Sequence, residues 1–93
     1  MKPRKLLEQA AARLDLPSEA AGLPKLEING FSRLSVEQHR GVLEYTGEAV
    51  TVALADGRVR ITGCRLSITV MNRSFLTLTG ELRGIELIPE GCP

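Results

Sequence analysis

The 93-residue sequence has few aromatic side chains and almost no excess charge of either sign. It contains two Phe, one Tyr and no Trp, which excludes an extended platform of rings for stacking nucleic-acid bases. Twelve basic and eleven acidic residues give a formal net charge of +1, so no strong field attracts nucleic acid or anionic lipid indiscriminately. A chain of this length forms a single domain. Because aromatic residues are scarce, the core of that domain must be aliphatic.

Cysteine and long apolar runs are also scarce. Cys64 and Cys92 form neither a disulfide framework nor a zinc site, and we expect two reduced thiols. The longest nearly apolar run, residues 49–55, is far shorter than the roughly 20 residues of a membrane-spanning helix. Polar and acidic residues from Glu8 onward interrupt the region after the basic start before it reaches signal-peptide length. We therefore expect a cytoplasmic protein that is soluble on its own.

Residues 1–16 have the periodicity of an amphipathic helix. The apolar side chains recur every three or four residues in one stripe: Leu6, Leu7, Ala10, Ala11 and Leu14. Pro17 ends the helix because it disfavours helical geometry at the residue before it, and residues 17–24 form a Pro/Gly hinge. We expect this helix to be an arm that binds a partner through Leu6, Leu7 and Leu14. Two alternatives stay open, namely a cap on one open end of the β domain and contact with lipid.

From residue 25 to residue 89 the period changes to two, and residues 90–93 form a tail. Asn29-Gly30 and Asp56-Gly57 are strong signals for two-residue hairpin turns. Short alternating runs between turn signals predict a mainly β fold, a small antiparallel β-sandwich of about seven to eight strands. The expected core comprises the inward-facing residues of these runs: Leu26, Ile28, Val50, Val52, Ile61, Leu66, Ile68, Leu76 and Leu78.

A hydroxyl residue followed by glycine closes three of these runs. The pairs are Thr46-Gly47, Thr62-Gly63 and Thr79-Gly80, separated by about the length of one hairpin. This weak repeat indicates the same corner used three times, and a β-solenoid is the alternative.

The sequence offers few residues for catalysis. His39 is the single histidine, no nucleophile motif is present, and the glycines are isolated rather than clustered in a phosphate-binding loop. We expect no enzyme activity, no metal, no cofactor and no small-molecule substrate. The segment His39-Arg40-Gly41 is interpreted as a strand connection in which Gly41 supplies an unusual backbone angle and His39 bonds locally. The alternatives are a recognition corner, in which Arg40 pairs with a carboxylate of a partner, and an enzyme centred on His39.

Arginines alternate with aliphatic residues in one of the β runs. Arg58 and Arg60 project from one sheet face, and Arg65 and Arg73 extend the basic character. A nucleic-acid-binding β module using Arg58, Arg60 and Arg65 is therefore an alternative function. The other interpretation is a solvated outer face whose long side chains protect an edge.

Residues 36–45 read Val-Glu-Gln-His-Arg-Gly-Val-Leu-Glu-Tyr. This segment resembles the hallmark of the YabP/YqfC sporulation protein family, in which an aliphatic residue, Glu and a polar residue precede His-Arg-Gly, aliphatic residues and Glu-Tyr. Gln38 stands where the family pattern has Asn. Residues 23–26, 57–68 and 79–86 resemble further family blocks in the same order. The N-terminal helix and the Leu16-Pro17 junction are more similar to the YqfC branch.

The resemblance implies a small β-sandwich protein of endospore-forming bacteria, made in the sporulating mother cell and needed for a proper spore. It implies a membrane-associated partner, so the protein would lie in the cytoplasm or at the forespore membrane through that partner. The family brings no catalytic residues. We expect a non-enzymatic protein–protein interaction module whose partner-binding candidates are His39, Arg40, Glu44, Tyr45, Leu6, Leu7 and Leu14. Its small core and open strand edges also predict a homo-oligomer, most simply a dimer.

Overall fold

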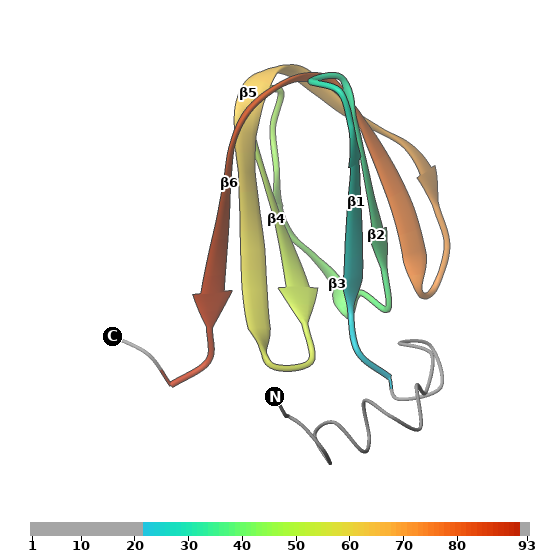
Figure 1. The fold of residues 1–93 in the computed structure, drawn as a ribbon, viewed down its shortest axis with the longest axis vertical. Coiled ribbons are helices and arrows are strands. Elements are labelled where there is room, and N and C mark those ends of the chain that lie inside the picture. The colour runs from blue at the N-terminus through green and yellow to red at the C-terminus, as the bar shows by residue number, and fades with distance from the viewer. Residues whose placement is uncertain (1–21, 92–93) are drawn as a thin grey trace, which may run out of the picture.

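The computed structural model describes residues 22–91, which form six β-strands in one antiparallel sheet (Figure 1). The strand order is β1-β2-β6-β5-β4-β3. The strands are β1 (Lys25–Asn29), β2 (Arg33–Glu37), β3 (Gly41–Tyr45), β4 (Ala49–Leu54), β5 (Gly57–Met71) and β6 (Phe75–Pro89). The helix expected at residues 1–16 lies outside the described residues, as does most of the hinge. No helix among residues 22–91 has the length and apolarity needed to cross a membrane.

Strands β5 and β6 are 15 residues long, and each replaces two of the short strands expected from the sequence. The strict alternation of apolar and polar residues stops near Gly63, so a strand was expected to end there. In the structure the β5–β6 register shifts between Thr62 and Gly63 and again between Cys64 and Ser67, but pairing continues beyond both shifts. A β-bulge inserts a residue into one strand without ending the ladder. The domain therefore has six strands, and the expectation of seven or eight was wrong.

The long β5–β6 pair bends into an arch that folds the sheet over on itself (Figure 1). The first half of β5 pairs with β4, whereas the first half of β6 pairs with β2. The arch thus places β3 and β4 on one side and β1 and β2 on the other. Gly80 lies at the bend with φ +141°, and a Cβ there would lie 2.6 Å from the Arg65 carbonyl oxygen. The structure shows one open sheet and does not show the two separate sheets of a sandwich.

The core fills the space inside the arch. Its buried members come from the four central strands of the sheet: Leu34 and Val36 of β2, Val50 and Val52 of β4, Val59, Ile61 and Leu66 of β5, and Leu76, Leu78 and Leu82 of β6. Six of the nine expected core residues are buried, and Leu26 and Ile68 pack against them while partly exposed. Ile28 was wrong as a core residue, because 52% of its surface is exposed on edge strand β1.

The turns differ in detail from the sequence signals. Asn29 pairs with Arg33, so the first hairpin has a three-residue loop instead of the two-residue turn expected at Asn29-Gly30. Leu54 pairs with Gly57, which leaves Ala55-Asp56 as the two-residue turn of the β4–β5 hairpin.

The three Thr-Gly pairs do not mark three equivalent corners. Thr62-Gly63 and Thr79-Gly80 lie within the long strands at the bend, whereas Thr46-Gly47 lies in the β3–β4 turn. That turn contacts the bend directly, since the N–H of Leu66 donates to the Gly47 carbonyl at 2.8 Å. Because every pairing is antiparallel within one sheet, the described chain is not a β-solenoid.

Candidate functional site

His39 lies in the connection between β2 and β3 and is buried, with 4% of its surface exposed. Its Nδ1 accepts a hydrogen bond from the N–H of Gly41 at 3.0 Å. An imidazole nitrogen that accepts carries no proton, so Nε2 bears the hydrogen of the neutral ring. Nε2 then donates to the carbonyl oxygen of Asn72 at 3.0 Å, in the turn between β5 and β6. The ring therefore joins two loops that are 33 residues apart, with both nitrogens engaged.

The same corner is fixed by its backbone. The N–H of Gln38 donates to the Ser74 carbonyl, and the N–H of Arg40 donates to the Ala53 carbonyl at 2.7 Å. Gly41 has φ +127°, a backbone conformation that side-chain-bearing residues rarely adopt. The unusual backbone angle and the local hydrogen bond expected at His39-Arg40-Gly41 are both confirmed.

Arg40 is the exposed member of this corner. It lines a hollow of about 430 Å³ together with Leu43 of β3, Arg58 of β5 and Glu90. Within the described residues, neither Arg40 nor Arg58 forms an ion pair. Leu43 is 63% exposed. The corner therefore presents two guanidinium groups and one carboxylate beside an apolar side chain.

Glu44 belongs to a polar row across the outer face of the sheet. In the register, Glu44 lies opposite Thr51, and Thr51 lies opposite Arg60. The hydroxyl of Thr51 donates to Glu44 Oε1 at 2.8 Å, and Arg60 Nε donates to the same oxygen at 3.3 Å. The Thr51 hydrogen bond and then the Arg60 hydrogen bond hold the pKa of Glu44 below its ordinary value, because both favour the charged carboxylate.

Tyr45 points to the opposite face from Glu44. It lies opposite the buried Val50, so its side chain is on the core side of edge strand β3. Its hydroxyl oxygen accepts a hydrogen bond from the backbone N–H of Ile68 at 2.9 Å. This bond and a second with the Ser67 side chain lower the pKa of Tyr45. Tyr45 therefore joins β3 to the second half of β5.

The four described candidates thus do not converge on one site. His39 and Arg40 lie before the start of β3, and Glu44 and Tyr45 lie at its end on opposite faces. Leu6, Leu7 and Leu14 lie outside the described residues. Sequence reasoning missed Leu43 as a neighbour of Arg40, because a register shift between Val42 and Glu44 disturbs the alternation that would have located it.

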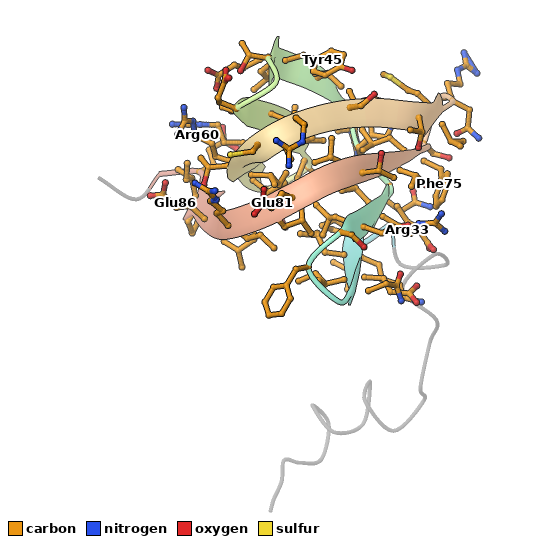
Figure 2. All side chains as sticks on the ribbon, turned by 90° about the horizontal axis from the view of Figure 1, so that it is seen from above. Arg33, Tyr45, Arg60, Phe75, Glu81 and Glu86 are labelled. Atoms are coloured by element: carbon orange, nitrogen blue, oxygen red, sulfur yellow. The ribbon has the colours of Figure 1, made fainter. Side chains whose placement is uncertain are left out.

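The arginines of the outer face are interleaved with carboxylates (Figure 2). Arg60 pairs with Glu44, and Glu81 pairs with Arg65 at 3.3 Å and with Arg83 at 3.7 Å. Arg65 and Arg83 keep well over half of their side-chain surfaces exposed, so these pairs are weak individually. Within residues 22–91, no group of three or more His, Cys, Asp or Glu side chains could hold a metal ion.

These features define a class: a small domain made of one antiparallel sheet folded over a two-strand arch, with a His-Arg-Gly corner in which the histidine is buried and the arginine is exposed. The family model of the YabP family matches residues 22–91, which is the whole described sheet. The chain therefore belongs to the YabP family, and this membership indicates a sporulation-related protein. Neither the comparison with curated proteins nor the comparison with solved structures found a match.

Proposed function

We propose that the chain is a non-enzymatic interaction module of spore formation that binds a membrane-associated partner in the mother cell. The observation that carries this proposal is the rigid, exposed corner around Arg40. The buried ring of His39 and the hydrogen bond from the Arg40 N–H to Ala53 fix the backbone there, so the Arg40 guanidinium is presented from a preorganised loop. Preorganisation lowers the conformational cost of binding.

The chemistry of the corner favours a partner segment with both acidic and apolar side chains. Arg40 and Arg58 offer planar guanidinium groups, which suit bidentate bonds to carboxylates. Leu43 supplies exposed apolar surface beside them. A charged and apolar combination of this kind supports specific protein recognition better than indiscriminate binding to phosphate.

The engagement of His39 supports a non-enzymatic role. A general base needs a ring nitrogen that can accept a proton from substrate. In this structure Nδ1 already accepts from Gly41, and Nε2 donates to Asn72 away from solvent. His39 is therefore suited to fixing the loop that carries Arg40.

We also propose that the chain belongs to the YqfC-like branch, to which its Leu16-Pro17 junction is similar.

We further propose that the protein acts as a homodimer. The outer edges of β1 and β3 end the sheet within the described residues, and unpaired edges offer backbone groups to a second copy. Strand β3 carries a register shift, which disfavours regular pairing at that edge. Strand β1 is the edge better suited to a second copy.

The function is tested by sporulation of a strain whose own copy of the gene is replaced by variants. We expect Arg40→Ala to lower the yield of heat-resistant spores at a wild-type protein level. Arg33→Ala, which removes an exposed arginine from β2 on the far side of the arch (Figure 2), is the matched control and should sporulate normally. Normal spore yield with Arg40→Ala would contradict the proposed role of this corner.

A further inference from the structure

One side of the folded sheet leaves core-facing side chains uncovered. Residues directly opposite each other in an antiparallel ladder point to the same face. Ile85 lies opposite the buried Ile61, and Leu87 lies opposite the buried Val59. Both therefore point to the core side of β6. Nevertheless, Ile85 is 37% exposed and Leu87 is 65% exposed.

Strand β1 forms the other wall of this uncovered region. Ile28 lies opposite the buried Leu34, so it also points to the core side, yet it is 52% exposed. A hollow of about 240 Å³ is lined by Ile28, Phe31 and Ile85 among others. A second hollow of about 100 Å³ lies further along β6, where Leu87 and Pro24 line it. We call this region the β1–β6 groove and define it by Pro24, Ile28, Phe31, Ile85 and Leu87.

The opposite side of the arch is closed by a specific contact. There, the Tyr45 hydroxyl joins edge strand β3 to the second half of β5 through the Ile68 N–H. On the groove side, the hydrogen bond from the Leu82 N–H to the Phe31 carbonyl lies next to the bend. Phe31 lies in the turn after β1, and among the described residues no backbone hydrogen bond outside the strand ladders joins β1 itself to β6. The groove is thus the open side of the core.

We propose that the N-terminal segment, residues 1–16, packs its apolar stripe into the β1–β6 groove and completes the core. The chain outside the described residues joins the sheet at this place, because Pro24 both precedes β1 and lines the groove. The segment is therefore tethered to the apolar surface through residues 17–23. Tethering makes its binding intramolecular and raises its effective concentration there.

The size and chemistry of the segment match the groove. A helix over residues 4–14 would be about 16 Å long at about 1.5 Å per residue. Strand β1, at five residues, spans a similar length of about 16 Å. Leu6, Leu7 and Leu14 supply aliphatic side chains, and the alanines between them allow close approach to a sheet. This placement favours the capping alternative for the helix over a free arm. Arg40 itself does not line either hollow of the groove, although Arg58 lines both the second hollow and the one beside Arg40.

The test compares two leucines that the described sheet exposes almost equally. Leu87 is 65% exposed in the groove, and Leu43 is 63% exposed on β3. In the full-length protein, we expect Leu87→Ser to lower the melting temperature by at least about 5 °C, on the scale for a domain of this size. Leu43→Ser should shift it by less than about 2 °C on the same scale. Equal small shifts for both variants would overturn the proposal.

A second set of variants tests the segment itself. Leu7→Ser should lower the melting temperature in the same way, whereas Gln9→Ser, outside the stripe, should leave it unchanged. The double variant with Leu7→Ser and Leu87→Ser should lose less than the sum of the two single losses, because contacting residues are not additive. An unchanged melting temperature with Leu7→Ser, or strict additivity, would overturn the proposal.

Isotope-filtered NMR on a mixture of labelled and unlabelled full-length protein identifies the occupant of the groove. We expect NOEs from the methyl groups of Leu6, Leu7 or Leu14 to those of Ile85 or Leu87 within one molecule. Groove NOEs that occur only between molecules would show that a second copy fills the groove and would contradict the proposal. Absence of any NOE from the stripe to the groove would contradict it as well.

Discussion

The hydroxyl of Tyr45 and the backbone N–H of Ile68, 23 residues apart in the sequence, form a 2.9 Å hydrogen bond that closes one side of the folded sheet. Beyond residue 62, β5 no longer pairs with β4, so the Ile68 N–H has no strand partner on that side. The Tyr45 side chain reaches across the core side of the sheet to supply one. The aromatic residue of the family hallmark thus has a structural role in the arch.

Tyr45→Phe removes this hydroxyl and leaves the ring in place. We expect the melting temperature to fall by a few degrees while the fold is retained, because the Ile68 N–H loses its acceptor. Thermal unfolding of the purified variant measures this, and amide hydrogen exchange should show faster exchange at Ile68 than in the wild type. Unchanged exchange at Ile68 would show that Tyr45 does not hold β5 in solution.

His39→Ala should destabilise the domain strongly. The substitution leaves the Gly41 N–H and the Asn72 carbonyl without their partner. Each unsatisfied buried polar group costs about 1–3 kcal/mol, and each kcal/mol corresponds to about 4–8 °C in a domain of this size. Thermal unfolding checks this prediction, and a melting temperature within about 2 °C of wild type would contradict the structural role of the ring.

Val52→Asp should prevent folding. Val52 is fully buried in the core, and an unpaired buried charge costs a free energy comparable to the whole stability of about 5–15 kcal/mol. Val70→Asp is the matched control, because Val70 is 50% exposed near the end of β5. Circular dichroism should show an unfolded Val52→Asp chain and a folded Val70→Asp chain. A cooperative melt of Val52→Asp near the wild-type temperature would show that the core is placed wrongly.

Glu44 predicts an acid-sensitive contribution to stability. Its pKa in the folded state is depressed below the ordinary value of 4.5, mainly by the Thr51 hydroxyl and then by Arg60. A group with a depressed folded pKa stabilises the fold above its unfolded pKa, and that contribution is lost as the pH falls through the folded pKa. The wild type should therefore lose stability relative to Glu44→Gln as the pH falls from about 5 to the folded pKa. This range begins about half a pH unit above the unfolded pKa of Glu44.

Melting temperatures of both proteins between pH 7 and pH 3 measure the effect of Glu44. Glu48→Gln, an exposed carboxylate in the adjacent turn, serves as the control and should follow the wild-type profile. Parallel profiles for the wild type and Glu44→Gln would contradict a role of this hydrogen-bonded row in the folded state.

The alternation of apolar and polar residues predicted most of this fold. Val50 and Val52, Ile61, and Leu76 and Leu78 are buried as their period-two runs require, and pairing is antiparallel throughout. The number of strands could not be predicted, because a β-bulge within a strand and the end of a strand both interrupt the alternation of apolar and polar residues. Near Gly63 the chain bulges and bends while its hydrogen bonds with β6 continue.

Edge positions could not be predicted for a related reason. The sequence shows that Ile28 points to the same face as its alternating neighbours, but not that β1 lies at the edge of the sheet. Strand order depends on contacts between distant segments, such as β2 with β6. The first and last members of the order β1-β2-β6-β5-β4-β3 are therefore known only from the structure.

Part of the His-Arg-Gly corner could be predicted from the sequence, and part of it could not. Gly41 and the local hydrogen bond of His39 follow from turn chemistry, which is readable from neighbouring residues. The partner of Nε2 is the carbonyl of Asn72, which no local pattern indicates. The exposure of Arg40 beside Leu43 and Arg58 likewise depends on the packing of β3 against β4 and β5.

Quantitative co-purification from sporulating cells shows whether the Arg40 corner binds a partner. Tagged wild type, Arg40→Ala and Arg33→Ala would be expressed at equal levels and the proteins recovered with each compared by mass spectrometry. We predict that a membrane protein recovered with the wild type and with Arg33→Ala is lost with Arg40→Ala, while all three proteins have the same melting temperature. Equal recovery of that membrane protein with Arg40→Ala would show that the Arg40 corner does not bind it.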